Sequence, residues 1–273
     1  MSKNIRLATK QDIPYLCEIW KACFPDSFEY IEYFYRENFE HVKAYVCCAD
    51  GRPVTLAHLF DAVIKDGENE YKAYYAYAGG TLPEYRHHGH FEACIRHLQK
   101  TAVDDGRILF LKPSESLISY YQFLGCVKAS EFKVITFKPE SNTHFEFEDL
   151  SYKEYNKMRD AAFSKGTYVK WSDEYVRWCV DENAFFSGKT LKVKIDGKEY
   201  FLMAYPKGDE LIVNETNLEA DLLKQVGGAL CDLFAKKTIK AYMPEYCKEG
   251  EEEMSSYIYN SELRNYYVNL ILT

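Results

Sequence analysis

Long apolar runs are missing from this sequence of 273 residues. No stretch is apolar for even half of the roughly 20 residues that a membrane-spanning helix needs, so we expect no membrane partner. The polar start, Met1-Ser2-Lys3-Asn4, also lacks the apolar core of a signal peptide. C-x-x-C pairs are missing too, and the nine cysteines lie mostly within apolar patterns. These features predict reduced, buried thiols in a cytoplasmic protein.

Positive charge is in deficit. The chain has 34 Lys and Arg against 42 Asp and Glu, a net charge of −8, and no Arg-rich run. This balance argues against a nucleic-acid partner, because nothing offsets repulsion from the phosphates. An acidic surface suits a cationic acceptor such as an amine at the level of steering, although ordinary solubility accounts for most of the acids.

A metal site is not expected. His87, His88 and His90 place three candidate ligands within four residues. No fourth ligand follows at a spacing typical of zinc sites, so the pattern does not predict a bound metal.

The most informative segment runs from residue 72 to residue 102. An aromatic strand pattern at residues 72–78 stops at Gly79-Gly80, where the backbone can splay or approach a ligand closely. The turn at residues 86–91 reads RHHGHF, and apolar residues at helical spacing continue to residue 102. A helix that begins at such a turn has unpaired backbone N–H groups, an arrangement that favours a phosphate.

A second motif follows at a suitable distance. Residues 107–113 form a short apolar strand pattern, and residues 116–126 form a helical pattern that Gly125 is expected to end. Tyr121 lies on the inward face of that helix, whereas Tyr120 lies about 100° around it. Tyr121 is therefore either a core aromatic residue or a catalytic hydroxyl.

Strand, arginine-glycine turn and amphipathic helix in this order resemble the acyl-CoA pyrophosphate loop of the GCN5-related N-acetyltransferases (GNAT), which reads Gln/Arg-x-x-Gly-x-Gly/Ala. Phe91 departs from the small final residue of that loop. The second motif is similar to the closing strand and helix of the family, in which the residue corresponding to Tyr121 protonates the leaving thiolate. Cys126 replaces the usual aromatic residue there, and Ser114 stands where Asn is common.

The resemblance implies that the N-terminal half transfers the acetyl group of acetyl-CoA, its acyl-donor substrate, to an amine by direct attack. Backbone N–H groups of the loop would hold the pyrophosphate, the end of the strand would pair with the pantetheine amides, and Tyr121 would be the catalytic acid. The expected cofactor-binding residues are Gly79, Gly80, Thr81, Arg86, His87, His88, Gly89, His90, Phe91 and Ser114. A small-molecule or peptide amine is expected as acceptor, and a homodimer is left open.

The general base is the missing part. Many family members use a Glu on the strand before the loop, but this strand offers only tyrosines. Tyr75 or Tyr77 could position a water, or an acceptor-side residue could reach in. A third alternative is the carboxylate of Thr273, as a resemblance to the Eis-like acetyltransferases implies. The acceptor-side candidates are Glu29, Glu32 and His41. The aromatic residues of that region form either a slot for the amine or interdomain packing, and they are Tyr30, Tyr33, Phe34 and Tyr35.

The chain is longer than one such domain of about 150 residues. We expect an α/β (α+β) protein of two tandem GNAT-like domains, residues 1–139 and 144–273, each a mixed, mostly antiparallel sheet flanked by helices. The first half has the family order βααβββαβαβ, and the second half repeats βααβββαβ. Its turn at residues 216–221 has no Arg-x-x-Gly and carries two acids, which suit a helix start but repel pyrophosphate. The second half is therefore expected to be degenerate and cofactor-free.

The patterns also predict where the elements lie. In the first half strands are expected at residues 5–8, 42–49, 53–64, 72–78, 107–113 and 132–137. Four helices are expected there: one that begins at residue 12, one at residues 28–39, one that follows the turn at residues 86–91 and ends at residue 102, and one at residues 116–124. In the second half strands are expected at residues 145–147, 190–195, 200–205, 210–215 and 238–243, and helices at 153–163, 170–183 and 222–234. The apolar tail at residues 266–272 is expected to form a closing core strand.

A rival interpretation from another class is a non-catalytic acyl-CoA-binding or interaction module. The absent strand Glu, Phe91 and Ser114 favour it. Aminoacyl or N-myristoyl transfer on the same fold is a third alternative, but the charge balance argues against the tRNA-binding face that aminoacyl transfer needs.

Overall fold

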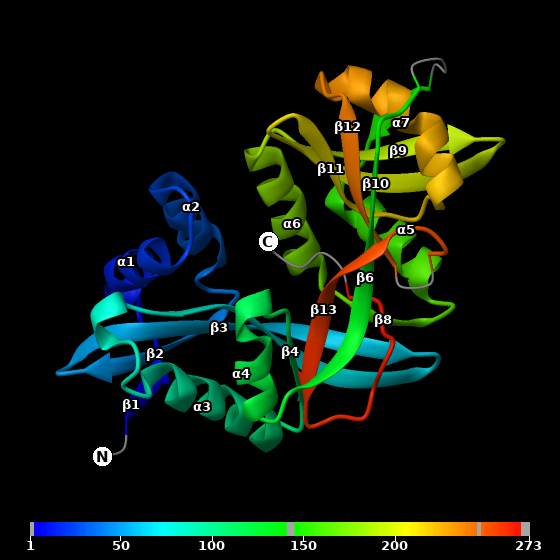
Figure 1. Cartoon of the computed structure of the whole chain (residues 1–273). Helices are drawn as coiled ribbons and strands as arrows, with labels where there is room; N and C mark the ends of the chain where they lie inside the picture. The colour runs from blue at the N-terminus through cyan, green and yellow to red at the C-terminus, as the bar shows by residue number, and fades with distance from the viewer. Residues whose placement is uncertain (1–2, 141–144, 245–246, 269–273) are drawn as a thin grey trace. The chain divides into compact units, whose positions relative to one another are not determined.

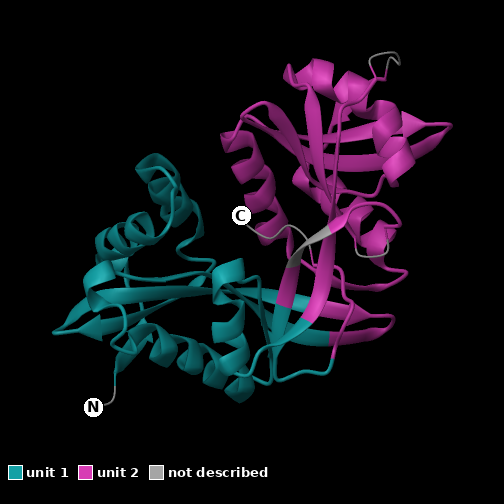
Figure 2. Ribbon diagram, in the orientation of Figure 1, with its two compact units in different colours: residues 1–63, 71–128, 257–262 teal, residues 64–70, 129–256, 263–273 magenta. Residues whose placement is uncertain are grey.

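The structure is a computed structural model that describes residues 3–140, 145–244 and 247–268 (Figure 1). The chain forms two compact units (Figure 2). Unit 1 holds the residues up to 63, residues 71–128 and residues 257–262, and unit 2 holds residues 64–70, 129–256 and those from 263 onward. Each unit contains a mixed, mostly antiparallel sheet flanked by helices, as the sequence predicts.

The sheet of unit 1 has the strand order β1, β2, β3, β4, β5 and the end of β13. Its strands are β1 (Asn4–Leu7), β2 (Lys43–Ala49), β3 (Arg52–Asp66), β4 (Asn69–Thr81), β5 (Ile108–Leu111) and β13 (Glu251–Tyr259). Its helices are α1 (Ile13–Cys23), α2 (Phe28–Asn38), α3 (His90–Asp104) and α4 (Ile118–Phe123). β4 and β5 run parallel, whereas β2 pairs antiparallel with both β1 and β3. With β6 (Val127–Phe137) next along the chain, the expected order βααβββαβαβ is confirmed.

Local sequence signals explain where these elements start and turn. Asp12 precedes α1, and a proline lies in the first turn of that helix. The Ser27 hydroxyl accepts a hydrogen bond from the Tyr30 N–H at 3.1 Å and so caps α2. Between β2 and β3, Asp50 and Gly51 both have positive φ, 48° and 81°. A two-residue type I′ hairpin turn requires this conformation.

Helices cover both faces of the sheet of unit 1: α1 and α2 lie on one face, and α3 and α4 on the other (Figure 1). Beneath α3 and α4, apolar residues of both helices pack on the strands, and Cys94, Leu98 and Leu109 are among the buried members. Beneath α1 and α2 the core is aromatic, because Trp20 packs on Phe34 with 4.7 Å between ring centroids. No helix among the described residues is long and apolar enough to cross a membrane.

The sheet of unit 2 has the order β13, β6, β12, β11, β10, β9 and β7. Its further strands are β7 (Phe147–Asp149), β9 (Lys189–Ile195), β10 (Lys198–Lys207), β11 (Glu210–Thr216) and β12 (Thr238–Pro244). Its helices are α5 (Tyr152–Phe163), α6 (Asp173–Phe185) and α7 (Ala220–Phe234). β11 and β12 run parallel with α7 between them, which is the connection that β4, α3 and β5 make in unit 1.

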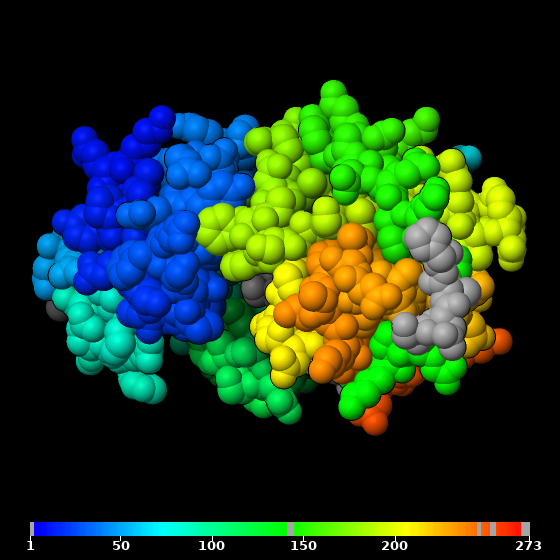
Figure 3. Space-filling model, turned by 90° about the horizontal axis from the view of Figure 1, so that it is seen from above, coloured from blue at the N-terminus to red at the C-terminus, as the bar shows by residue number. Residues whose placement is uncertain are grey.

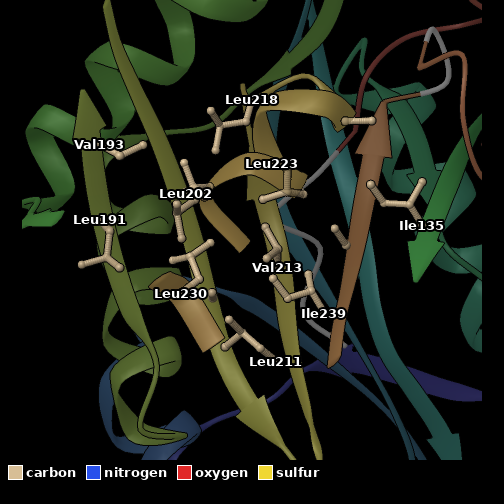
Figure 4. Packing of buried hydrophobic residues seen from close by; sticks show 14 of the residues in the cluster. Ile135, Leu191, Val193, Leu202, Leu211, Val213, Leu218, Leu223, Leu230 and Ile239 are labelled. Carbon is tan, nitrogen blue, oxygen red and sulfur yellow. The ribbon is translucent and has the colours of Figure 1, made fainter. Parts of the chain in front are cut away.

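The core of unit 2 lies between α7 and the strands. Leu223 and Leu230 of α7 point toward Leu202, Val213 and Ile239 of the sheet (Figure 4). The other side of α7 is at the surface, where the helix forms part of the orange region in Figure 3. α7 is therefore an amphipathic helix, as its sequence pattern predicts.

Several expected elements of unit 2 are wrong in position or were missed. β7 starts two residues later than expected, at Phe147. β8 (Thr167–Lys170) occupies residues where the pattern gave no strand, and α6 starts only at Asp173 because Ser172 caps it. β13 was not predicted, because its first residues are acidic. The expected closing strand at residues 266–272 lies partly outside the described residues, and Tyr267 forms a single parallel bridge with Tyr168.

The polar stretch at residues 138–143, where the two expected domains meet, also lies partly outside the described residues. Residues 129–137 of β6, which the sequence assigns to the first half, group with unit 2. The end of β13, from Tyr257 on, groups with unit 1 because it pairs with β5. Long-range strand pairing of this kind has no local sequence signal.

Candidate active site

The site is built where β4 and β5 separate. The two strands pair in parallel from Ala73 with Ile108 to Ala76 with Leu111, where β5 ends, while β4 continues to Thr81. The expected break at Gly79 is wrong in detail, because both glycines belong to the strand. Just beyond the last paired residue, Ala78 has a left-handed φ of 43°, a conformation that disrupts a strand. The backbone of residues 77–81 therefore extends past its parallel neighbour.

The turn before α3 leaves the start of that helix open. His87 and Gly89 have left-handed φ values of 62° and 75°, and Gly89 is the N-cap residue. Glycine has no side-chain oxygen to cap the helix, and the first hydrogen bond of α3 runs from the Ala93 N–H to the Gly89 carbonyl at 3.1 Å. The N–H groups of residues 90–92 precede this bond, so they are available to an anion at the positive end of the helix dipole.

Arg86 connects the turn to the end of β4. Its Nε donates to the Thr81 carbonyl at 3.0 Å, and its guanidinium lies 3.8 Å from the Cys23 sulfur. The Thr81 hydroxyl in turn shares a hydrogen bond of 2.9 Å with the Thr55 hydroxyl. Arg86 and Thr81 thus hold the loop against the strand.

The histidines of the turn separate into two kinds. His87 and His88 are exposed, whereas His90 is buried at the first position of α3. The His90 ring lies 3.5 Å from the Cys47 sulfur and 3.4 Å from the Lys3 ammonium. Burial, followed by the Lys3 charge, lowers the pKa of His90. Among the described residues, no group of three His, Cys, Asp or Glu is arranged to hold a metal ion.

Ser114 lies at the far side of the gap between the strands. It is exposed and precedes a short 3₁₀ turn, η3 (Glu115–Leu117), and its hydroxyl lies 3.3 Å from that of Ser116. The structure therefore places it at the start of the segment that leads into α4.

Tyr121 points inward from α4, as its helical position predicts, and is 8% exposed. Burial raises the pKa of its phenol well above the ordinary value, so the hydroxyl keeps its proton at neutral pH. A protonated phenol in an apolar site can donate to a developing thiolate. Gly125 ends the helix with a left-handed φ of 88°, and the Cys126 N–H bonds to the Tyr121 carbonyl at 2.9 Å.

Phe91 joins the two sides of the gap. Its ring stacks on Tyr120 at 5.9 Å and meets Tyr121 edge-on at 6.4 Å. On the other side its Cε2 atom lies 2.9 Å from the position that a Cβ of Gly79 would occupy. A side chain at residue 79 would collide with this ring.

A residue of β3 that sequence reasoning missed contacts the backbone of β4. His58 of β3 is fully buried; its Nε2 lies 3.1 Å from the Tyr35 hydroxyl and its Nδ1 lies 3.3 Å from the Tyr77 carbonyl. Burial lowers the pKa of His58 to about 4, so the ring is neutral near pH 7. With Nδ1 as the donor to Tyr77, Nε2 accepts from Tyr35. A histidine between apolar neighbours in the middle of β3 was the one available signal.

The aromatic residues of α2 form packing rather than a slot at their buried positions. Phe34 is completely buried and contacts His58 at 5.6 Å and Tyr77 at 6.0 Å between ring centroids, all within unit 1. Tyr30 and Tyr35 are also buried, while Tyr33 is half-buried.

The alternative bases differ in access. Tyr75 is buried and stacks on Phe110 at 5.3 Å, while Tyr77 is half-buried beside the open part of β4. The acceptor-side candidates Glu29, Glu32 and His41 are exposed. Thr273 lies outside the described residues.

Comparison with protein families identifies the family of the N-terminal half. Residues 4–129 match the model of the acetyltransferase (GNAT) domain. The N-terminal half of the chain belongs to the GNAT family. The resemblance to the GNAT family is thereby confirmed for this half, and the protein is an acyltransferase enzyme. A search of curated protein sequences found no match.

Solved structures share the fold at low identity. A probable N-acyltransferase from Enterococcus faecalis is 13% identical with a TM-score of 0.72, covering 94% of this chain and 72% of its own. A GCN5-related N-acetyltransferase from Anabaena variabilis is 15% identical with a TM-score of 0.69, covering 94% and 72%. Eis1 from Mycobacterium abscessus is 12% identical with a TM-score of 0.61, covering 93% and 73%. These matches reach beyond the GNAT domain into unit 2.

The corresponding place in unit 2 has a different character. A cavity of about 350 Å³ lies at the start of α7 and is lined by residues 216–221 together with Met243, Pro244, Cys247, Lys248 and Glu249. Glu219, Asp221 and Glu249 bring carboxylates to this cavity, and Glu219 is the N-cap residue of α7. Glu219 and Asp221 lie at the start of α7, where unit 1 has Gly89 and Phe91, whereas Glu249 pairs with Lys224.

Proposed function

We propose that this GNAT enzyme transfers the acetyl group of acetyl-CoA to an amine of a small molecule or peptide by direct attack, and that the transfer takes place in unit 1. The observation that carries the proposal is the opening between β4 and β5, which lies beside the uncapped start of α3. N–H groups of residues 90–92 supply donors for a diphosphate, and the unpaired end of β4 supplies amide partners for pantetheine.

The residues of unit 1 fit this donor. Gly79 and Gly80 add no side chains of their own at the end of β4, where the side chains of Phe91 and Cys23 lie against the strand. Arg86 is already engaged with Thr81, which fixes the loop before binding. Ser114 lies at the segment that leads into α4.

The transfer needs one proton to move at each end. The amine nitrogen forms a bond to the thioester carbonyl carbon, the carbon–sulfur bond breaks, and the Tyr121 hydroxyl gives its proton to the departing thiolate. The proton that the amine releases goes to a water molecule. Tyr77, which belongs to the part of β4 beyond its pairing with β5, is the residue that positions this water. The raised pKa of Tyr121 keeps its phenol a donor at neutral pH.

We further propose that residues 144–273 are a degenerate GNAT-like domain that binds no acyl-CoA. The connection β11–α7–β12 repeats that of β4–α3–β5. Glu219 and Asp221 at the start of α7 would repel a pyrophosphate, since like charges meet there without a basic residue from an Arg-x-x-Gly turn.

A second candidate function is a non-catalytic acyl-CoA-binding module. The specific observation in its favour is the Phe91 ring, which lies against Gly79 and Tyr121 where a productive donor must pass.

The experiment that separates the two uses the full chain. Acetyl-CoA binding is measured by calorimetry. Turnover is followed over a panel of amines by loss of the thioester, because Cys23 and Cys247 are free and only half-buried and would compete for thiol reagents. Tyr121→Phe is expected to bind acetyl-CoA as the wild type does and to lose about 100-fold in turnover. The matched control is Tyr120→Phe, which removes a hydroxyl from the same helix and should leave turnover unchanged. Binding without turnover on every amine would support the module, and absence of binding would overturn both functions.

A further inference from the structure

Phe91 stands where the GNAT loop pattern has a small residue, and its ring fills a defined position. It is the second residue of α3. The ring reaches Tyr120 and Tyr121 of α4, at 5.9 and 6.4 Å between centroids, and lies against the backbone of Gly79 in β4. It therefore bridges the strand and the helix that border the opening.

This position lies on the path that the donor must take. The path, which rests on the proposed function, starts at the open N–H groups of α3, follows the unpaired end of β4 and ends at Tyr121. A pantetheine chain that pairs with Gly79 passes through the space between β4 and α4. The Phe91 ring now takes up part of that space.

We propose that Phe91 is the gate residue of the donor groove: its ring closes the groove in the free enzyme and turns away when acyl-CoA binds. The residue thereby sets the affinity for the donor. Binding must first break the contacts of the ring with Tyr120 and Tyr121, so the observed dissociation constant rises as the open form becomes rarer.

The surroundings of the ring support a movable gate rather than a core residue. Phe91 is only half-buried, whereas Cys94 and Leu98 farther along α3 are completely buried. Phe91 also lies in the first turn of its helix, next to a loop with two left-handed residues. Phe91 packs at the edge of the buried cluster beneath α3 and is not one of its buried members, so turning the ring outward uncovers that edge only.

The first test measures donor affinity by calorimetry with coenzyme A. Phe91→Ala is expected to lower the dissociation constant about tenfold, the order of factor that one aromatic pair corresponds to. Phe91→Leu should give an intermediate value, and Phe91→Trp should weaken binding. The matched control is Phe123→Ala, which removes an aromatic side chain from α4 that is 69% exposed and should leave affinity unchanged.

The outcomes distinguish this inference from the proposed function. Equal or weaker binding by Phe91→Ala would overturn the gate while leaving acetyl transfer in place. Binding by Phe91→Ala alone would support the gate and count against turnover by the wild type. If neither protein binds coenzyme A, both proposals fall.

The second test locates the ring without a ligand. Because a Cβ at residue 79 would lie 2.9 Å from the Phe91 ring, Gly79→Ala should lower the melting temperature of the wild type by about 2 to 4 °C. In the Phe91→Ala background the same change should have no effect. Equal losses in both backgrounds would show that the ring does not lie against β4.

Discussion

His58 shows how one buried side chain fixes the backbone next to the open part of β4. Its ring joins the Tyr35 hydroxyl of α2 to the Tyr77 carbonyl of β4. Tyr77 precedes Ala78, whose left-handed backbone marks the end of the pairing with β5. A neutral imidazole can donate a hydrogen bond through one nitrogen and accept one through the other. An amide or hydroxyl side chain differs from the imidazole in length and would not make both bonds at the same distances.

The lowered pKa of His58 predicts a loss of stability in acid. The folded-state pKa of about 4 lies below the ordinary histidine value of 6.5, so folding favours the uncharged ring. This contribution is fully present above pH 6.5 and is lost as the pH falls toward 4. Linkage gives about 3 kcal/mol for such a shift.

The measurement is chemical denaturation of the wild type and His58→Gln at pH 7 and pH 4.5. The variant should lose less stability over this range, because Gln does not titrate. The control is His41→Gln, an exposed histidine, whose pH profile should follow that of the wild type. Parallel profiles for the wild type and His58→Gln would contradict the assignment.

At the residue scale, the sequence predicts the orientation of a side chain within a local motif better than it predicts the partners of that side chain in the folded structure. Tyr121 was expected to face inward because it falls on the apolar side of a short helix, and it does. The departure at Phe91 was visible from one position of the loop, but its contact with Gly79 was not. His58 was missed because its partners come from α2 and β4, elements that no spacing along the chain links to β3.

At the element scale, α3 and the turn before it were predictable because the turn chemistry and the helical period agree. Gly89 supplies the left-handed N-cap, and the apolar positions up to residue 102 face the core. The ends of strands were less predictable. β4 continues through Gly79 and Gly80 since neighbouring strands, rather than propensity, decide where pairing stops.

Within unit 2, α5 and β11 are joined by a buried ion pair. Arg159 and Glu215 are both completely buried, with 3.0 Å between Nε and Oε1, and the Tyr155 hydroxyl donates to Glu215 at 2.6 Å. Glu215 thus lies at the end of the strand that corresponds to β4, but its carboxylate is engaged by Arg159 and Tyr155.

Removing one partner should be costly. Glu215→Gln leaves the Arg159 charge buried without its counter-ion, and the expected loss is about 3 to 5 kcal/mol of unfolding free energy. The double variant Arg159→Met, Glu215→Leu should lose less, because no charge remains buried.

Denaturation followed by fluorescence reports on unit 2 through Trp171 and Trp178. Lys224→Ala, which breaks an exposed pair with Glu249, is the control and should cost under about 1 kcal/mol. A loss for Glu215→Gln no larger than that of the control would refute the ion-pair account.

At the scale of the whole molecule, both units contain the same connection of strand, helix and parallel strand, but the helix begins differently in each unit. In unit 1, α3 begins at Gly89 with open N–H groups, and in unit 2, α7 begins at Glu219 beside further carboxylates. Apart from β8 and β13, the order of elements was predictable in both halves. The pairing of β13 with β5 was not, because residues that lie far apart in the chain decide it.

The central claim is that the donor binds in unit 1 through the start of α3. Its most direct test is hydrogen exchange of the full chain with and without acetyl-CoA. We predict that peptides covering residues 79–92 gain protection, because their free N–H groups become bonded to the ligand, and that peptides covering residues 216–221 do not change. Protection confined to residues 216–221, or no protection at residues 79–92 under saturating acetyl-CoA, would contradict the account.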